Sequence, residues 1–331
     1  MKTITEKLVV ERSGVAAEAN FSIKATAKSF EILSSGLYSD KILAIVRELS
    51  CNAYDSHVAA GKADTPIEIK LPNYLDSTFY VRDYGVGMSH EDVMQLYTTY
   101  FESTKTASND FIGQLGLGSK SPFSYVSTFI VESWFKGIQR TYTCYKDESG
   151  LPAIALLNEQ ETTECNGMKI SIAVKKVDTE KFTGAARKAL MYFSPAPTIV
   201  GDAHFKPYTV SHTAHGSNWK LRMSDHSAYM QGAYVIQGFV SYPINGSLLA
   251  EHPMSAQAQA LCFVDLDLSV GIGDVEVAAS REALSYDKRT VTNLIAAVEL
   301  AATELRASFQ REFDACANHW DAAVLYRRFM S

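Results

Sequence analysis

Three polar residues share one side of a predicted helix in the first part of the chain. Glu48, Asn52 and Asp55 are spaced four and then three residues apart, so their side chains lie on one helix face. A carboxylate such as Glu48 can act as a general base, and the amide oxygen of Asn52 is a hard ligand of the kind that Mg²⁺ accepts. A solvated helix face would contain the same residue types, and this helix alone does not decide between the two interpretations.

A second candidate is the segment Asp83–Met88, which reads Asp-Tyr-Gly-Val-Gly-Met and directly follows a predicted strand. Gly85 and Gly87 allow a sharp turn and a close approach of backbone to ligand. The carboxylate of Asp83 can accept a hydrogen bond from an exocyclic amine such as that of adenine. An ordinary aspartate–glycine turn is the alternative for a pattern this short.

The third candidate is a glycine-rich loop that leads into a helix predicted to begin near Ser119. Its glycines are Gly113, Gly116 and Gly118. Free N–H groups at a helix N-terminus favour anions, and glycines let a loop wrap a polyphosphate, to which Lys105 would add a positive charge. The spacing is neither that of a Walker loop nor that of a dinucleotide-binding βαβ unit. A simple turn is the alternative.

The elements that position these residues follow from the periodicity of apolar side chains. Those between Tyr38 and Ala60 recur at helical spacing, and Gly61 ends the predicted helix. Further helices are predicted at 91–97, 179–192 and 289–313, and strands at 67–71, 79–81, 129–135, 140–145, 153–157, 169–174, 234–242 and 262–268. This order predicts an α+β fold made of two-layer α/β sandwiches, each with helices on one face of its sheet. The predicted domains are a polar arm at 1–28, a first domain at 29–195 and a smaller α+β domain at 196–331.

Composition narrows the function classes. The chain has 331 residues, a formal net charge of −6 and no run of Lys and Arg, which disfavours binding to nucleic acid through phosphates. Its five cysteines form no Cys-x-x-Cys pair, which favours a reducing compartment over a disulfide framework or a zinc site. No apolar run approaches the roughly 20 residues of a membrane span. We therefore expect a cytoplasmic protein without an integral membrane segment.

In this order, the three candidates resemble the motifs of the GHKL ATPases, the superfamily of gyrases, heat-shock chaperones, histidine kinases and MutL proteins, which share the Bergerat ATP-binding fold. Arg47–Asp55 is similar to the helix motif E-x-x-x-N, and Asp83–Gly87 to the motif D-x-G-x-G. Residues 103–105 and 112–121 resemble the lid and third glycine box of the heat-shock chaperone branch. Val275–Leu284 resembles the segment whose arginine reaches the γ-phosphate, so the second domain is expected to be of the transducer or middle type.

The resemblance implies a site for ATP and Mg²⁺. In it Glu48 is the general base, Asn52 holds the metal and Arg281 reaches the γ-phosphate. The implied nucleotide-binding residues are Asn52, Asp55, Asp83, Gly85, Gly87, Met88, Lys105, Gly113, Gln114, Leu115, Gly116, Leu117, Gly118, Ser119 and Met168. Met168 departs from the family, which has a threonine there, and the missing hydroxyl removes a hydrogen bond worth about 0.5–1.5 kcal/mol. This predicts weaker adenine binding.

The predicted function is a slow ATPase that acts as a nucleotide-dependent conformational switch and forms a homodimer on binding ATP. The residue sequences of Gly116–Phe123 and Ser280–Tyr286 resemble the amino-terminal part of the phage rapid-lysis (RIIA) proteins. That resemblance implies a phage-encoded protein in the host cytoplasm, with an unidentified host or phage partner, that affects lysis timing or host exclusion and defence. The alternatives are a chaperone-like ATPase with protein clients and a nucleotide-sensing module that does not hydrolyse ATP.

Overall fold

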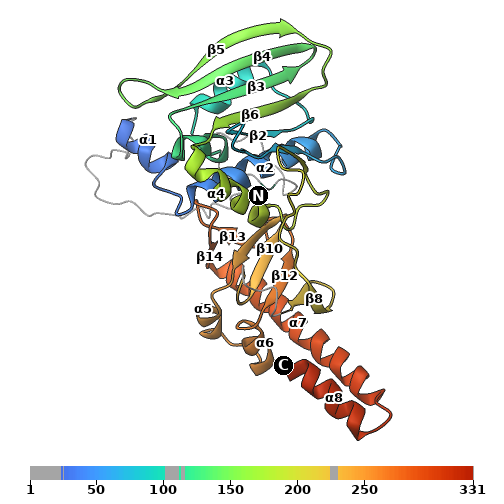
Figure 1. Cartoon of the computed structure of the whole chain (residues 1–331). Helices are drawn as coiled ribbons and strands as arrows, with labels where there is room; N and C mark the ends of the chain where they lie inside the picture. The colour runs from blue at the N-terminus through green and yellow to red at the C-terminus, as the bar shows by residue number, and fades with distance from the viewer. Residues whose placement is uncertain (1–23, 25, 101–111, 113–115, 224–229, 331) are drawn as a thin grey trace, which may run out of the picture. The chain divides into compact units, whose positions relative to one another are not determined.

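The computed structural model describes residues 24, 26–100, 112, 116–223 and 230–330, and the chain divides into two compact units, Met1–Tyr208 and Thr209–Ser331 (Figure 1). Each unit combines helices with a β-sheet, so the predicted α+β class is confirmed. Of the arm predicted at 1–28, residues 1–23 and 25 lie outside the described part of the chain.

A mixed seven-stranded sheet forms the framework of the first unit, in the order β5-β4-β3-β6-β2-β1-β7. Neighbouring strands are antiparallel except for β1 and β7, which are parallel. The strands are β1 Glu68–Lys70, β2 Thr78–Arg82, β3 Thr128–Phe135, β4 Ile138–Lys146, β5 Pro152–Glu161, β6 Gly167–Ala173 and β7 Thr198–Val200. The helices are α1 Ala27–Ser34, α2 Lys41–Ala59, α3 His90–Thr98, η1 Gly118–Ser124, η2 Lys176–Asp178 and α4 Thr179–Ala189.

Helix α2 is the central element of the first unit. The side chain of Asp40 caps its first turn by accepting the N–H of Leu43 at 3.0 Å. The helix contacts α4, η1, β2 and β6, and Figure 1 shows α2 and α4 together on one side of the sheet. Polar as well as apolar positions of α2 are therefore buried, including Glu48 and Asp55 beside Ile45 and Leu49.

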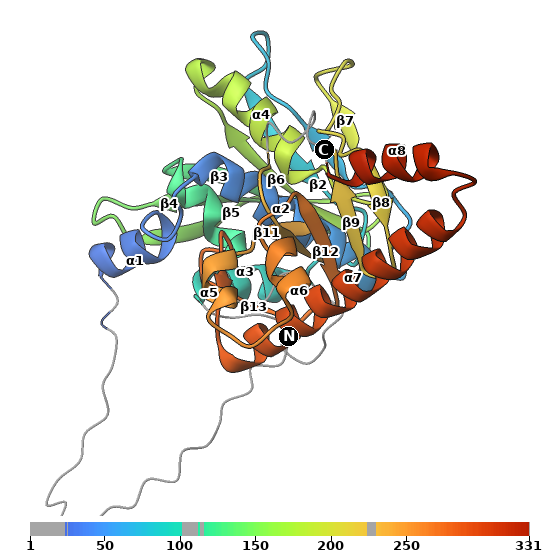
Figure 2. The same ribbon diagram turned by 90° about the horizontal axis from the view of Figure 1, so that it is seen from below.

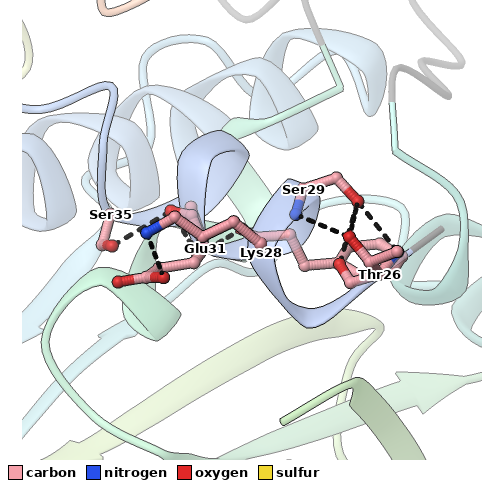
Figure 3. Close-up of polar contacts among 7 residues, drawn as sticks. Thr26, Lys28, Ser29, Glu31 and Ser35 are labelled. Carbon is pink, nitrogen blue, oxygen red and sulfur yellow. Dashed lines mark hydrogen bonds and ion pairs between the residues drawn. The ribbon is translucent and has the colours of Figure 1, made fainter. Parts of the chain in front are cut away.

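Helix α1, which the sequence pattern did not predict, begins with a capping box. The N–H of Ser29 donates to the hydroxyl of Thr26 at 3.2 Å, and the N–H of Thr26 donates to the hydroxyl of Ser29 at 2.9 Å (Figure 3). Lys28 and Glu31 form an exposed ion pair at 2.8 Å, a kind of contact that adds little stability. The capping box therefore defines where this short helix begins.

The second unit contains a five-stranded sheet in the order β11-β10-β12-β9-β8 and the hairpin β13–β14. Its strands are β8 His212–His215, β9 Trp219–Arg222, β10 Tyr234–Gln237, β11 Val240–Pro243, β12 Leu266–Val270, β13 Glu276–Val277 and β14 Leu284–Ser285. Its helices are α5 Gly246–Ala250, α6 Ala256–Leu261, α7 Lys288–Asp314 and α8 His319–Met330. The long helix predicted at 289–313 is confirmed as α7, and α8 turns back after it (Figure 2).

Two predicted strands of this unit are wrong in detail. The strand predicted at 234–242 is the hairpin β10–β11, because Gly238 adopts a φ of +65° and reverses the chain. The segment predicted as a strand at 262–268 begins at the C-cap of α6, and only its last part belongs to β12. A sequence pattern of apolar residues does not reveal a turn that depends on one glycine within it.

Strand β7 determines where the first compact unit ends. It lies beyond residue 195, at which the predicted first domain ends, and it pairs in parallel with β1. The unit therefore continues to Tyr208, and the functional domain boundary at 195 stays a prediction. Within the described ranges, no helix is both long enough and apolar enough to cross a membrane.

Candidate functional site

The first residue of η1 lies against the polar face of α2. A Cβ atom on Gly118 would stand 2.6 Å from Oε2 of Glu48 and 3.3 Å from the amide nitrogen of Asn52. A side chain at position 118 would have to displace the Glu48 carboxylate, so the end of the glycine-rich loop lies directly against the predicted base and metal ligand. Glu48 and Asp55 are buried, which excludes the solvated-face interpretation of this helix.

The two polar groups beside Gly118 differ in their surroundings. Oε1 of Glu48 accepts the Nε–H of the buried Arg47 at 3.3 Å, and Oε2 faces Gly118. Such a partner offsets part of the cost of burying a carboxylate. Asn52 is half-buried, and its amide makes no hydrogen bond to any residue in the described part of the chain. Its oxygen can therefore act as a ligand without breaking an internal contact.

The carboxylate of Asp83 is buried and held through one oxygen. Oδ1 accepts the hydroxyl of Ser56 at 2.9 Å and the N–H of Gly85 at 3.0 Å. Both of these donors bond to Oδ1, and the backbone of Met168 also stabilises the charged carboxylate. Burial raises the pKa of this carboxyl group, although the N–H of Gly85 and the hydroxyl of Ser56 oppose the shift. The turn therefore presents one carboxylate oxygen with unused acceptor capacity.

The turn after Asp83 is pressed against the sheet. Gly87 has a φ of +67°, and a Cβ there would lie 2.2 Å from the carbonyl oxygen of Trp134. The following Met88 exchanges two hydrogen bonds with Ser133, whose hydroxyl accepts the Met88 N–H at 3.2 Å and donates to the Met88 carbonyl at 2.7 Å. These contacts fix the turn to β3, whereas an ordinary aspartate–glycine turn needs no such attachment to a neighbouring strand.

Met168 lies in β6, directly opposite Ser133 of β3, and its side chain is buried. Its carbonyl oxygen accepts the N–H of Asp83 at 2.9 Å. Cross-strand partners project to the same face of a sheet, so Met168 and Ser133 share one face. The effect of Met168 on adenine affinity stays a prediction.

Asp55 anchors the glycine-rich loop at its start. Its Oδ1 accepts the N–H of Ile112 at 2.8 Å, and the carboxylate is completely buried. The structure thus gives Asp55 a backbone partner in the loop, and its contact with a nucleotide stays a prediction. Four further predicted site residues lie outside the described part of the chain: Lys105, Gly113, Gln114 and Leu115.

The helix predicted near Ser119 is η1, a seven-residue 3₁₀-helix that follows the buried Leu117. A helix this short has little macrodipole, which weakens the anion-binding argument that the sequence suggested. It carries instead the hydroxyls of Ser119, Ser121 and Ser124, all buried and without a hydrogen-bond partner in the described part of the chain. Buried hydroxyls are usually paired, so a run of three in one short helix suits a ligand rich in acceptor oxygens.

Sequence reasoning missed three side chains around this site. Lys120 is 1% exposed, and its Nζ donates to the carbonyl of Gly116 at 2.9 Å. Ser56 and His57, at the end of α2, contact the Asp83 turn. Their only sequence signal is that Ser56 and His57 directly follow Asp55 and that Lys120 lies inside the glycine box.

Arg281 lies in the second unit, in the turn between β13 and β14. It is 5% exposed, and its N–H donates to the carbonyl of Ala278 at 2.8 Å. Its φ of +54° is unusual for a residue with a long side chain, and such conformations cluster at functional positions. The contact of Arg281 with a γ-phosphate stays a prediction.

The mixed sheet, the helices on its face and the site beside α2 are consistent with the ATP-binding sandwich of the GHKL class, followed by a further α+β unit. Residues 41–171 match the family described as histidine kinase-, DNA gyrase B-, and HSP90-like ATPase. This range contains every predicted site residue except Arg281. The matched segment is thus similar to a GHKL-type ATPase domain.

Three curated relatives are bacterial proteins named chaperone protein HtpG. Those of Wolbachia sp. subsp. Brugia malayi and Rickettsia typhi are each 27% identical to this chain, over 46% of it and 27% of their own length. That of Buchnera aphidicola is 24% identical, over 47% of this chain and 28% of its own length. The chain thus spans little more than a quarter of the length of the relatives it matches.

Proposed function

We propose that the first unit binds ATP with Mg²⁺, hydrolyses it slowly, and serves as a nucleotide-dependent conformational switch. The observation that carries the proposal is the close approach of Gly118 to Glu48 and Asn52, which joins the glycine-rich loop to the polar face of α2. The match of residues 41–171 to the ATPase family supports the same activity.

Each residue of the site has a role that its surroundings support. Oδ2 of Asp83 accepts a hydrogen from the adenine amine, and the hydroxyls of η1 donate to phosphate oxygens. Asn52 would hold Mg²⁺, which neutralises charge on the phosphates when it is bound. One amide oxygen and the phosphate oxygens would be a sufficient ligand set, because Mg²⁺ keeps several of its waters.

Hydrolysis requires one proton transfer to the protein. Glu48 takes a proton from water as the water oxygen attacks the γ-phosphorus, the bond to the β-phosphate oxygen breaks, and ADP leaves. Arg47 pairs with Oε1 of Glu48, and Oε2 faces the loop end at Gly118. We assign to Arg281 the stabilisation of the γ-phosphate, which would make closure of the second unit dependent on nucleotide.

The biological setting extends this proposal. The resemblance of Gly116–Phe123 and Ser280–Tyr286 to the phage rapid-lysis proteins supports a switch that acts on a host or phage protein. Closure as a homodimer on ATP binding belongs to the same proposal.

A chaperone-like ATPase is the second candidate function, and an observation in the second unit favours it. In helix α8, Trp320 is 76% exposed to solvent and Val324 is 52% exposed. These two residues lie one turn apart on the same helix face. Exposed apolar surface of this kind suits unfolded protein clients. The wild type should suppress the heat-induced aggregation of a model protein, and Trp320→Ser should not. Equal suppression by the wild type and the variant would exclude α8 as the client-binding surface.

Calorimetric titration of ATP with Mg²⁺ tests the proposed function. The wild type should bind with one site per chain, Asp83→Asn should bind at least about ten- to a hundredfold more weakly, and Glu48→Gln should bind but not turn over. Ser247→Ala, an exposed position in α5, is the control and should bind like wild type. Absence of binding by the wild type would refute the proposal and leave an interaction module without nucleotide.

A further inference from the structure

The last turns of α2 hold the Asp83 turn through two consecutive side chains. Ser56 contacts the Asp83 carboxylate and the backbone of Val86, and His57 contacts the backbone of Tyr84. One helix end therefore fixes a side chain and two backbone groups within four consecutive residues of the turn.

The direction of the Ser56 hydroxyl is determined by its partners. Its oxygen accepts the N–H of Val86 at 3.3 Å, and its proton is donated to Oδ1 of Asp83 at 2.9 Å. Since Gly85 donates to the same Oδ1, that oxygen has two donors within the protein. The carboxylate cannot rotate about its axis without losing both, so Oδ2 stays the oxygen that can accept from outside.

The tautomer of His57 is determined in the same way. The N–H of Tyr84 donates to Nε2 at 2.7 Å, and the carbonyl of Thr65 lies 2.9 Å from Nδ1. Because a carbonyl accepts and an N–H donates, only the neutral ring with its proton on Nδ1 satisfies both. The ring is completely buried, so these two bonds hold it and the Tyr84 backbone together. Lys62 adds a bond to the Tyr84 carbonyl at 2.7 Å.

We propose that Ser56 and His57 are positioning residues that make the site selective for a purine with a 6-amino group over one with a 6-oxo group. The inference rests on the proposed ATP site and adds a source of its base selectivity. An amino group donates to the fixed Oδ2, whereas a 6-oxo group would face it acceptor to acceptor. A carboxylate that could rotate or shift would discriminate less between the two purines, because it could move away from a 6-oxo group.

The experiment compares ATP with inosine triphosphate, which carries a 6-oxo group, in binding and steady-state turnover. The wild type should prefer ATP, and Ser56→Ala should reduce the ratio of the two affinities about tenfold, in line with the loss of one net hydrogen bond. The change should appear in KM, with kcat for ATP little altered, because neither residue contacts the phosphates. Ser247→Ala is the control for a serine lost from an exposed helix position.

Two substitutions of His57 separate its hydrogen bonds. In His57→Asn the amide replaces Nδ1 and keeps the bond to Thr65, whereas in His57→Gln the amide oxygen replaces Nε2 and keeps the bond to Tyr84. We expect His57→Asn to lose discrimination and His57→Gln to retain most of it. This pair decides the question if Ser56→Ala does not fold, because the two variants differ by one methylene group.

The outcomes distinguish this inference from the function on which it rests. Wild-type ratios of the ATP and inosine triphosphate affinities in Ser56→Ala and His57→Asn, with ATP binding weakened in Asp83→Asn, would overturn the inference and leave the proposed function intact. Equal loss in His57→Asn and His57→Gln would also overturn the assignment of His57 to the Tyr84 bond. Failure of the wild type to bind either nucleotide would overturn both.

Discussion

Replacing Asp83 by asparagine changes one buried atom of the candidate site from acceptor to donor. The new carbonyl oxygen can accept from Ser56 and Gly85 as Oδ1 does, and the amide nitrogen takes the position of Oδ2. The turn should therefore keep its internal hydrogen bonds. An adenine amine would then face an N–H group, so a charge-assisted hydrogen bond worth about 1.5–3 kcal/mol is lost. We expect ATP affinity to fall by about one to two orders of magnitude or more.

The same substitution predicts a change in the stability of the nucleotide-free protein. Burial raises the pKa of the Asp83 carboxyl group above its value in the unfolded chain, so the charged form is disfavoured in the fold. The resulting destabilisation is absent below the unfolded pKa of about 3.9 and grows as the pH rises toward and through the folded pKa. Asparagine does not titrate. Asp83→Asn should therefore melt at a higher temperature than wild type at pH 7.5, with a difference that shrinks toward pH 4.

Two assays test this prediction together. Calorimetry measures ATP affinity, and thermal unfolding without nucleotide measures stability at several pH values. Unchanged ATP affinity in Asp83→Asn would refute the assignment of the base contact. A melting temperature below that of wild type at every pH would show that the carboxylate stabilises the turn, contrary to the reasoning from burial.

The remaining predictions concern the phosphate side of the site. Glu48→Gln should bind ATP like wild type and lose turnover by about 10²–10⁴-fold, and an unchanged kcat would remove Glu48 as the base. Gly118→Ala places a methyl group 2.6 Å from Oε2 of Glu48 and should lower kcat more than affinity, with a normal rate showing that the carboxylate can move aside. Arg281→Ala should leave ATP binding intact and slow turnover, by up to about 10³-fold if it acts as an arginine finger, whereas a wild-type rate would exclude a catalytic contact. Asn52→Ala should raise the Mg²⁺ concentration that half-maximal activity requires, and identical titrations would exclude Asn52 as a ligand.

Sequence reasoning reached the parts of this fold that depend on local periodicity. The apolar spacing in α2 and α7 predicted both helices, because apolar side chains recur along each at helical intervals, although α2 is also buried at its polar positions. The same reasoning could not find the turn at Gly238, since strand and hairpin share one apolar run. It also assigned η1 to an ordinary helix, where the structure has a 3₁₀-helix that contains Pro122.

The candidate site was predictable as three motifs but not as one arrangement. Ser56 and His57 each bond to residues 27 positions away, and nothing in their own neighbourhood indicates that separation. The burial of Glu48 and Asp55 was equally hidden, because a solvated helix face contains the same residue types. A single sequence does not indicate which segment of the chain packs against the polar face of a helix.

The contacts of helix α2 explain why the three motifs form one site. Helix α2 contacts the loop start through Asp55 and Ile112, the loop end through Glu48 and Gly118, and the Asp83 turn through Ser56. A single rigid helix therefore sets the distances among the predicted base, the phosphate loop and the base-recognition turn. If Asp55 anchors the loop in this way, Asp55→Asn, which can keep an oxygen for the Ile112 N–H, should disturb ATP binding less than Asp55→Ala. Equal losses in the two variants would show that the charge of Asp55, rather than its bond to the loop, matters for the site.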